Sequence, residues 1–400
     1  MSSPAGKSFF VSLGLDIPAE LVDDFLAKLH YVSESAEGFE LVGDDGGDAR
    51  VRFRLPAGRE GERALVAERI VAVAEGMCQA ARFCEPKVLV RRERAPSFEG
   101  DPHALLEERG DLFKFGRGRY GLGPRLVELL EFFDRQLLRR AEQAGAAPHQ
   151  FPTLVGADLL ERCGYLRSFP HSLCLVSHLR EDMGAIQDFA RDARWDGGGL
   201  VFSPEASSRV ECLLSPTVCF HCYAWLQDGR LPRPAAFTAR GKCFRYESGS
   251  MSKLERLWDF TMRELIFVGP EGYVLAERRK AVESLAGLLD EWGLSYEIKS
   301  ATDPFFIDGY SAAAFQMAFD LKYEVRASLP YKGKTLAVGS FNFHRDHFGR
   351  ALNISCAEGE PANTGCVGFG LERLALAFLA QHGLDAKGWP AAVAEQVGGW

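Results

Sequence analysis

The stretch Arg240–Glu264, RGKCFRYESGSMSKLERLWDFTMRE, decides the predicted fold of this chain. We interpret it as two strands, Arg240–Glu247 and Arg256–Val268, connected by a short polar loop. Consecutive strands joined by short loops make a largely antiparallel sheet. Because side chains alternate along a strand, Arg245 and Glu247 would lie on the same face.

The returning strand carries a second set of functional side chains. Arg256, Phe260 and Glu264 are spaced by four residues and would also share a face. Another arginine, Arg373, begins an apolar-periodic helix within GCVGFGLERLALAFL, Gly365–Leu379. Arginine binds phosphate oxygens through paired hydrogen bonds, and a phenylalanine ring offers a flat apolar surface to a base. The pattern therefore predicts a nucleotide site.

The composition is that of an ordinary globular chain with two or three domains. The 400 residues are 46% apolar and 26% charged, and no run of eighteen apolar residues predicts a membrane span. The net charge of −8 argues against a surface dominated by contacts to nucleic-acid phosphates. Ten scattered cysteines, and a start that lacks a secretory signal, predict a cytoplasmic protein with reduced thiols.

The N-terminal third predicts a small α+β module followed by a linker. The module, residues 1–95, is acidic, because residues 1–100 hold 13 Lys and Arg against 17 Asp and Glu. The turn-rich residues 96–122 are predicted to be a linker. The expected β-α-β-β-α-β order of the module is Ser8–Leu15, Pro18–Leu29, Phe39–Val42, Val51–Leu55, Arg63–Arg82 and Lys87–Arg92.

Residues 123–400 predict a larger α+β domain, an antiparallel sheet flanked by helices. Its helices are expected at Pro124–Ala144, from an N-terminal cap at Ser215 to Trp225, at Glu271–Trp292 and at Leu371–His382. Its further strands are expected at His149–Val155, Leu321–Pro330, Thr335–Phe343, and either Asn353–Cys356 or Cys366–Phe369.

FRYE, RLWDF and GFGLER resemble motifs 2 and 3 of class II aminoacyl-tRNA synthetases, and Pro124–Ala144 with the next strand resembles motif 1, the usual dimer interface. The resemblance implies attack of an amino-acid carboxylate on ATP, giving an aminoacyl-adenylate, with Mg²⁺ and a homodimeric enzyme. It implies that Arg245 holds the α-phosphate and the carboxylate and is catalytic together with Arg373. By the same resemblance, Glu247 accepts from the adenine amino group, Phe260 stacks on adenine, and Arg256 and Arg373 hold the γ-phosphate.

LLSPTVCFHCY, CFRYE, LWDFTMRE, GSFNFHRDHFG and NTGCVGFGLERLALAFL carry a finer resemblance to the zinc-dependent seryl-tRNA synthetases of methanogens and to their relatives, the amino acid:[carrier protein] ligases. This resemblance implies a catalytic Zn²⁺ held by Cys219, Glu264 and Cys366. Three protein ligands leave one coordination position open. That position would take the neutral amino group of the substrate.

Other cysteines and histidines leave alternatives open. Cys222 lies one helical turn from Cys219, so a local structural zinc site is a second hypothesis. His344 and His347 are predicted to lie in a solvated loop after a strand. The remaining cysteines are interpreted as buried small apolar residues: Cys163, Cys174, Cys212, Cys243 and Cys356.

The ligands of Mg²⁺ and the substrate pocket are less distinct in the sequence. Many class II enzymes carry a magnesium-binding carboxylate in the strand before motif 3, but Leu336–Asn342 is apolar at the expected place. Ser340 and Asn342 are the candidate substrate-binding residues of this strand. A pocket selected by volume would suit a small amino acid of the glycine, alanine or serine class.

Three functions remain as hypotheses. The first is transfer of the activated amino acid to the phosphopantetheine thiol of an acyl or peptidyl carrier protein, favoured by the acidic N-terminal module and by the lack of a coiled-coil arm. The second is a zinc-dependent seryl-tRNA synthetase, because methanogen enzymes also carry an N-terminal α+β domain. A non-catalytic regulatory paralogue is the third, opposed by the presence of all three motif arginines.

Overall fold

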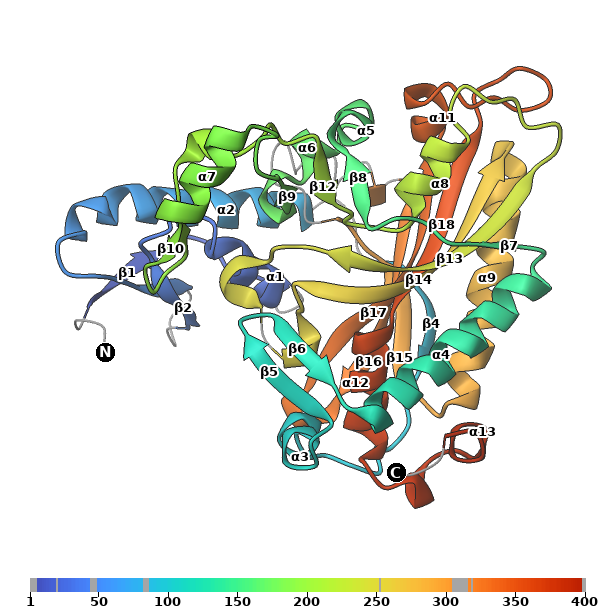
Figure 1. Ribbon diagram of the computed structural model, residues 1–400. Helices are drawn as coiled ribbons and strands as arrows, with labels where there is room; N and C mark the ends of the chain where they lie inside the picture. The colour runs from blue at the N-terminus through green and yellow to red at the C-terminus, as the bar shows by residue number, and fades with distance from the viewer. Residues whose placement is uncertain are drawn as a thin grey trace.

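The computed structural model describes residues 6–18, 21–43, 49–81, 86–251, 253–303, 316–317 and 319–397. Its centre is an eight-stranded sheet (Figure 1). Neighbouring strands are antiparallel, as predicted, except for the parallel edge pair β13–β7. The strand order is β4 (Val88–Arg92), β15 (Tyr296–Ser300), β16 (Lys322–Leu329), β17 (Lys334–Arg345), β18 (Asn363–Gly370), β14 (Asp259–Gly269), β13 (Ala235–Phe244) and β7 (Ala147–His149).

One face of this sheet is covered by three long helices, which carry the main core. They are α4 (Pro124–Gln143), α9 (Glu271–Glu291) and α12 (Leu371–His382), close to the bounds predicted from their apolar periodicity. Leu265 and Phe267 of β14 point into this core, so Glu264 and Ile266 point to the opposite face. That opposite face carries α8 (Cys219–Trp225) and α11 (His347–Ala351).

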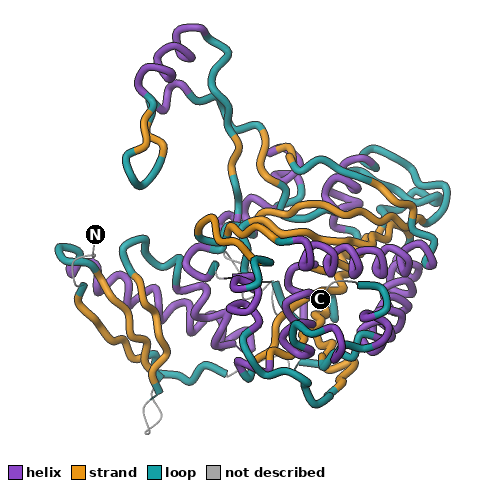
Figure 2. The backbone as a smooth tube through the Cα atoms, turned by 60° about the horizontal axis from the view of Figure 1, so that its bottom comes forward, coloured by secondary structure: helices purple, strands orange, loops and turns teal. Residues whose placement is uncertain are grey.

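The N-terminal part folds around a smaller core of its own. Its sheet has the order β1 (Lys7–Ser12), β3 (Arg50–Leu55), β2 (Glu37–Val42), and the predicted hairpin is confirmed. The helices α1 (Val22–Leu29) and α2 (Arg63–Ala81) pack beside these strands (Figure 2). Phe25 and Ile70 are fully buried between helices and sheet.

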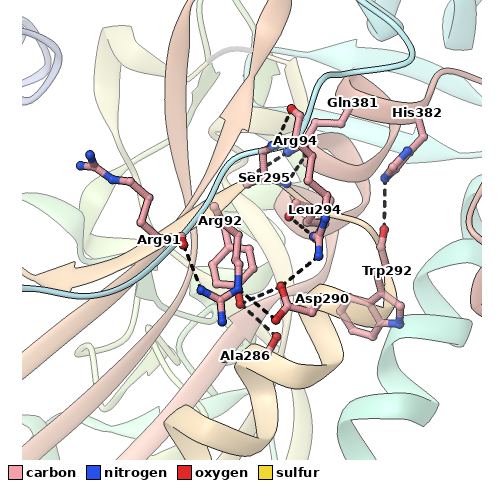
Figure 3. Close-up of polar contacts among 11 residues, drawn as sticks. Arg91, Arg92, Arg94, Ala286, Asp290, Trp292, Leu294, Ser295, Gln381 and His382 are labelled. Atoms are coloured by element: carbon pink, nitrogen blue, oxygen red, sulfur yellow. Dashed lines mark hydrogen bonds and ion pairs between the residues drawn. The ribbon is translucent and has the colours of Figure 1, made fainter.

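The last strand expected in the N-terminal module belongs elsewhere. β4 pairs with β15 at the edge of the large sheet, with Arg92 opposite Tyr296. Figure 3 shows how the segment is fixed: Arg92 Nε and Arg94 Nη2 lie 3.3 and 3.2 Å from the Asp290 carboxylate of α9. The predicted module order is therefore wrong in its final strand, because a strand's own sequence does not state which sheet edge it will join.

The segment predicted to be a linker is largely ordered structure. It contains α3 (Pro102–Glu108) and the hairpin β5 (Leu112–Gly116) and β6 (Arg119–Leu122). Asp101 caps α3, its carboxylate accepting a hydrogen bond from the His103 backbone N–H at 3.0 Å. Glycine, proline and aspartate mark helix caps and hairpin turns as well as linkers, which explains the wrong prediction.

The strand predicted at His149–Val155 is two short strands in different sheets. β7 ends at His149, and β8 (Leu154–Gly156) pairs with β12 (Cys212–Leu214), which also pairs with β9 (Leu175–Val176). Pro152, which cannot donate to a ladder, lies in the break. Between β9 and β12 an arm projects from the body (Figure 2), with α7 (Met183–Asp192) and the hairpin β10 (Arg194–Trp195) and β11 (Leu200–Val201).

Further short α-helices among the described residues are α5 (Ala157–Arg162), α6 (Tyr165–Ser168) and α13 (Ala391–Ala394). Of the two places predicted for the last strand, the second is correct, since β18 spans Asn363–Gly370. Within the described ranges, no helix combines the length and hydropathy needed to cross a bilayer.

Candidate active site

The loop after β13 holds most of the predicted nucleotide-binding residues. β13 ends at Phe244 and β14 starts at Asp259, so Arg245, Glu247 and Arg256 lie outside the strands. Contrary to the prediction, these three residues are not placed on one face by strand alternation. Ser248, within this loop, has φ +46°, a left-handed conformation.

The loop nevertheless brings the predicted charges together. Arg256 donates to Glu247 Oε2 at 2.6 Å. The Arg245 guanidinium lies over the Phe260 ring, 5.4 Å from its centroid, and Arg245 Nε donates to the Pro216 carbonyl at 3.0 Å. An arginine stacked on the ring leaves part of its donor fork directed elsewhere, which suits it to hold an anion beside the ring.

Arg373 joins this group from the start of α12, at the far end of the sequence. Its Nε donates to the Glu255 carbonyl at 2.6 Å, and Nη1 donates to the Ala337 carbonyl at 3.2 Å. Burial lowers the pKa of Arg373, and the charges of Arg256 and Arg245 lower it further. Burial alone would raise the pKa of Glu247, but the positive charges of Arg256, Arg373 and Arg245 hold it below its usual value. The three arginines and the glutamate thus form one electrostatic cluster.

Cys219, Glu264 and Cys366 form a second, adjacent cluster. Their ligand atoms all lie within 4.8 Å of one another, and all three side chains are buried. They come from three elements: the first residue of α8, the middle of β14 and the middle of β18. Gly368 faces Glu264 across the β14–β18 ladder, and a Cβ there would lie 2.7 Å from Met262 Cε and 3.5 Å from Glu264 Cγ. A side chain at position 368 would therefore crowd Met262 and stand in ordinary van der Waals contact with Glu264.

The acidic groups of this cluster would be stabilised in their ionised forms by a bound cation. Burial and the negative charge of Cys366 raise the pKa of Glu264 to about 7. A hydrogen bond with Cys366 together with burial raises the pKa of Cys219, and the same bond lowers the pKa of Cys366. Three acidic groups this close together cannot all be ionised because their negative charges repel, so they retain protons unless a bound cation takes the place of those protons.

One oxygen of Glu264 is left for that cation. Oε1 accepts hydrogen bonds from Thr217 Oγ1 at 2.6 Å and from the Val218 N–H at 3.1 Å. Oε2 is buried and has no hydrogen-bond partner among the described residues. Two thiols and a carboxylate form a donor set typical of zinc. The residues therefore fit the metal that the sequence predicted.

The helix that carries Cys219 begins later than predicted. α8 starts at Cys219, and the expected cap residue Ser215 instead donates through Oγ to the Thr217 carbonyl at 2.7 Å. The Ser215–Val218 segment is thereby free to present Thr217 and the Val218 N–H to Glu264. Cys222 is fully buried in the apolar cluster around α8 and is not part of the three-ligand group, which favours the Glu264 site over a local one.

The candidate substrate residues on β17 border the metal cluster. Asn342 donates through Nδ2 to Ser340 Oγ at 3.0 Å and to Cys366 Sγ at 3.5 Å. His344 was predicted to lie in a loop, which is wrong: it belongs to β17, and its Nε2 lies 3.8 Å from Cys366 Sγ. His347 is the first residue of α11, and its Nε2 donates to the Cys163 carbonyl at 3.0 Å.

Sequence reasoning missed a buried ion-pair group on β16. Lys322 Nζ lies 2.7 Å from Asp303 Oδ1 and 3.0 Å from Glu324 Oε1, and Arg326 binds the other oxygen of Glu324 at 3.2 Å. Glu324 faces Ser340 across the β16–β17 ladder. Each of its oxygens is thus engaged by one cationic side chain.

A cavity of about 320 Å³ lies on the other face of the sheet, between α4, α9 and strands β14 and β18. Arg263, Leu265 and Phe267 line it, and they alternate with the residues that face the metal cluster. This cavity is therefore separated from the candidate active site by the thickness of the sheet.

Comparisons with known proteins agree with this geometry. Residues 202–382 match the family described as tRNA synthetase class II core domain (G, H, P, S and T). The chain is 36% identical over 299 residues to amino acid--[acyl-carrier-protein] ligase 2 of Bradyrhizobium diazoefficiens, covering 74% of this chain and 86% of that protein. It is 28% identical to the type-2 serine--tRNA ligase of Methanothermobacter thermautotrophicus, covering 94% of this chain and 75% of that protein.

The fold is also similar to a solved structure. The seryl-tRNA synthetase of M. kandleri, crystallised with A. aeolicus tRNASec, superposes with a TM-score of 0.70 at 24% identity, covering 98% of this chain and 77% of that one. With the sequence comparison at 36% identity, these findings establish that the chain belongs to the amino acid--[acyl-carrier-protein] ligases, a family of ligases built on the class II synthetase core.

Proposed function

We propose that this enzyme activates a small amino acid with ATP and transfers it to the phosphopantetheine thiol of a carrier protein. The observation that carries the proposal is the position of the Cys219, Glu264 and Cys366 cluster next to the arginine cluster. Phe260 and Glu264 lie four residues apart on the same face of β14. Their positions are therefore separated by about 13 Å along the strand. An amino acid bound at the metal cluster would reach towards a nucleotide bound at the arginines.

In the proposed reaction, a carboxylate oxygen of the amino acid attacks the α-phosphorus of ATP. The bond from that phosphorus to the bridging oxygen breaks, and pyrophosphate leaves. Arg245 would neutralise the reacting anions, while Arg256 and Arg373 would hold the outer phosphates. Such attack between anions depends on positioning and on charge neutralisation. The thiol sulfur of the carrier protein then attacks the carbonyl carbon, and AMP leaves.

Zinc, when bound by Cys219, Glu264 and Cys366, would supply a Lewis-acid position for the neutral amino group of the substrate. Thr217 and the Val218 N–H hold Oε1 of Glu264, so Oε2 would be the ligand oxygen. Ser340 and Asn342 would line the side-chain pocket. We also propose a homodimer that works in the cytoplasm, with Mg²⁺ bound together with ATP.

The acceptor is tested by supplying ATP, zinc-loaded enzyme and radiolabelled glycine, alanine or serine. Holo-carrier protein and total tRNA are offered separately, and apo-carrier protein without phosphopantetheine is the matched control. We expect a base-labile thioester on the holo form alone. Label on tRNA instead would reverse the choice of acceptor. That second candidate is supported by an alignment with the methanogen-type serine--tRNA ligase that extends over 94% of the chain.

The metal site is tested by Cys366→Ala. We expect this variant to lose zinc and amino-acid-dependent ATP–pyrophosphate exchange together, because one of three ligands is removed. Zinc is measured by elemental analysis after gel filtration. Cys212→Ala is the control, since Cys212 is a partly exposed cysteine of β12 outside the cluster. Full zinc content in Cys366→Ala would remove the ligand assignment.

A further inference from the structure

His344 lies beside the candidate metal cluster but is not one of its ligands. The group whose ligand atoms lie within 4.8 Å of one another does not include it. Its Nε2 is 3.8 Å from Cys366 Sγ. On the other side of the ring, Nδ1 lies 3.1 Å from Thr364 Oγ1 and 3.5 Å from the Tyr223 hydroxyl. Among the described residues, the polar contacts of the ring are thus the Cys366 thiol on one side and two hydroxyls on the other.

The chemistry of these contacts fixes the tautomer when a metal is bound. A metal-bound thiolate has no proton and only accepts hydrogen bonds. The Thr364 and Tyr223 hydroxyls can each donate to Nδ1, so Nδ1 is the acceptor and Nε2 carries the proton. Nε2–H would then donate to Cys366 Sγ, alongside Nδ2 of Asn342 at 3.5 Å.

The backbone of β17 is irregular at His344. The β17–β18 register shifts between Phe343 and Arg345: Phe343 faces Gly365 and Arg345 faces Thr364, so His344 has no partner in the ladder. Arg345 has φ +54°, a left-handed conformation that is costly for a residue with a side chain. Bulges of this kind re-aim side chains next to functional sites.

We infer that His344 is a positioning residue that donates a hydrogen bond to the Cys366 thiolate and orients it towards the metal. This inference rests on the proposed function, since it requires a metal at Cys219, Glu264 and Cys366. Thr217 has a single hydroxyl proton, which it gives to Glu264 Oε1, although its oxygen lies 3.3 Å from Cys219 Sγ. Cys366 is thus the thiolate that the surrounding donors stabilise.

The test measures metal binding rather than activity alone. Removing a side chain that supports a metal ligand typically weakens metal affinity about 10–100-fold. We expect His344→Ala to release zinc to a chromogenic chelator faster by that factor. We also expect the thiolate-to-metal charge-transfer band of the Co²⁺-substituted enzyme to shift, which loss of packing alone would not cause. His344→Gln, which keeps an N–H donor, should recover part of both effects.

Controls separate this inference from the proposed function. His347→Ala changes the nearby histidine, which contacts the Cys163 carbonyl and not the cluster, and should leave both readouts unchanged. Thr364→Val keeps the imidazole ring and removes one partner of Nδ1, so it should change both readouts less than His344→Ala does. It replaces His344→Ala in the test if that variant proves unstable. Wild-type enzyme that binds no metal would contradict both the proposed metal-dependent function and the role of His344. Wild-type enzyme that binds zinc, with His344→Ala equal to it in release rate and spectrum, would overturn the role of His344 and leave the proposed function standing.

Discussion

Glu264 and Arg245 are each held by contacts on one part of the side chain, which leaves the other part available for a ligand. Glu264 is held through one oxygen by Thr217 and the Val218 N–H, and its other oxygen is left for a cation. Arg245 is held through Nε by the Pro216 carbonyl and lies over Phe260. Both anchors come from the short segment before α8. The segment thus fixes a proposed metal ligand and a proposed phosphate-binding group at the same time.

At the residue scale, Arg245→Ala should lower the rate of ATP–pyrophosphate exchange by about 10²–10³-fold, as the loss of one preorganised donor does elsewhere. The fold should persist, because one stacked guanidinium is removed from the edge of a loop. Circular dichroism melting checks the fold. Arg162→Ala, which breaks exposed contacts with Asp158 and Gln227 away from the cluster, should keep wild-type exchange. A variant at position 245 with normal exchange would contradict the proposed role.

At the scale of elements, the segment from α3 to β6 supports the loop after β13. Asp101 caps α3 and also pairs with Lys253 Nζ at 2.6 Å. The Gly118 carbonyl, at the turn between β5 and β6, accepts the N–H of Trp258 at 2.9 Å. A helix cap and a hairpin turn thus hold the segment of the loop that carries Arg256. Disturbing either one should alter the nucleotide site indirectly.

Asp101 offers a prediction with a defined pH dependence. Burial opposes ionisation, but Lys253 and the two His103 contacts lower the pKa of Asp101 to about 2, below its unfolded value of 3.8. A depressed folded pKa means that the ionised group stabilises the fold at pH values above about 4. That stabilisation is lost as the pH falls from about 4 towards 2.

Urea unfolding of two variants tests this prediction. Asp101→Asn keeps a good helix cap and removes the charge, whereas Asp101→Ala removes both. We expect Asp101→Ala to lose about 1 kcal/mol more unfolding free energy than Asp101→Asn at pH 7. The difference between wild type and Asp101→Asn should shrink as the pH is lowered below 4. A difference independent of pH would mean that the charge of Asp101 does not contribute.

At the scale of the whole molecule, the N-terminal module touches the loop that carries the proposed nucleotide-binding residues. Asp24 at the start of α1 lies 3.7 Å from Arg256, and Asp23 forms an ion pair with Lys334 of β17. The Tyr31 hydroxyl donates to the Tyr246 carbonyl at 3.0 Å. Gly249 accommodates His30, since a Cβ there would lie 2.0 Å from its Nδ1. The module therefore places negative charge beside an arginine that we propose holds the γ-phosphate.

Removing the negative charge of Asp24 should strengthen the binding of ATP. Asp24→Asn is expected to lower the KM for ATP by about 1.5–5-fold, since exposed ion pairs contribute about 0.2–1 kcal/mol. The effect should fade at high ionic strength. Asp188→Asn, which breaks an exposed pair on the projecting arm, is the control. An unchanged KM at low salt would show that Asp24 does not compete with ATP.

The sequence by itself determined the elements whose pattern is local and strong. The apolar periodicity of α4, α9 and α12 gave their bounds to within one residue, and β16 and β17 were placed nearly as well. β18 was one of two alternatives, and the correct one, Cys366–Phe369, covers only part of the strand. The three metal-site residues and the four charged groups were identified from motifs, and the fold brings each set together. Their roles remain predictions.

The tertiary structure alone decided how these elements meet. β4 joins β15 rather than the N-terminal sheet, and His344 points at Cys366 through a bulge. The loop after β13, not strand alternation, gathers Arg245, Glu247 and Arg256. Periodicity reports which face of an element is apolar, but sheet-edge pairing, bulges and loop conformations depend on partners distant in sequence. Those partners exist only once the chain is folded.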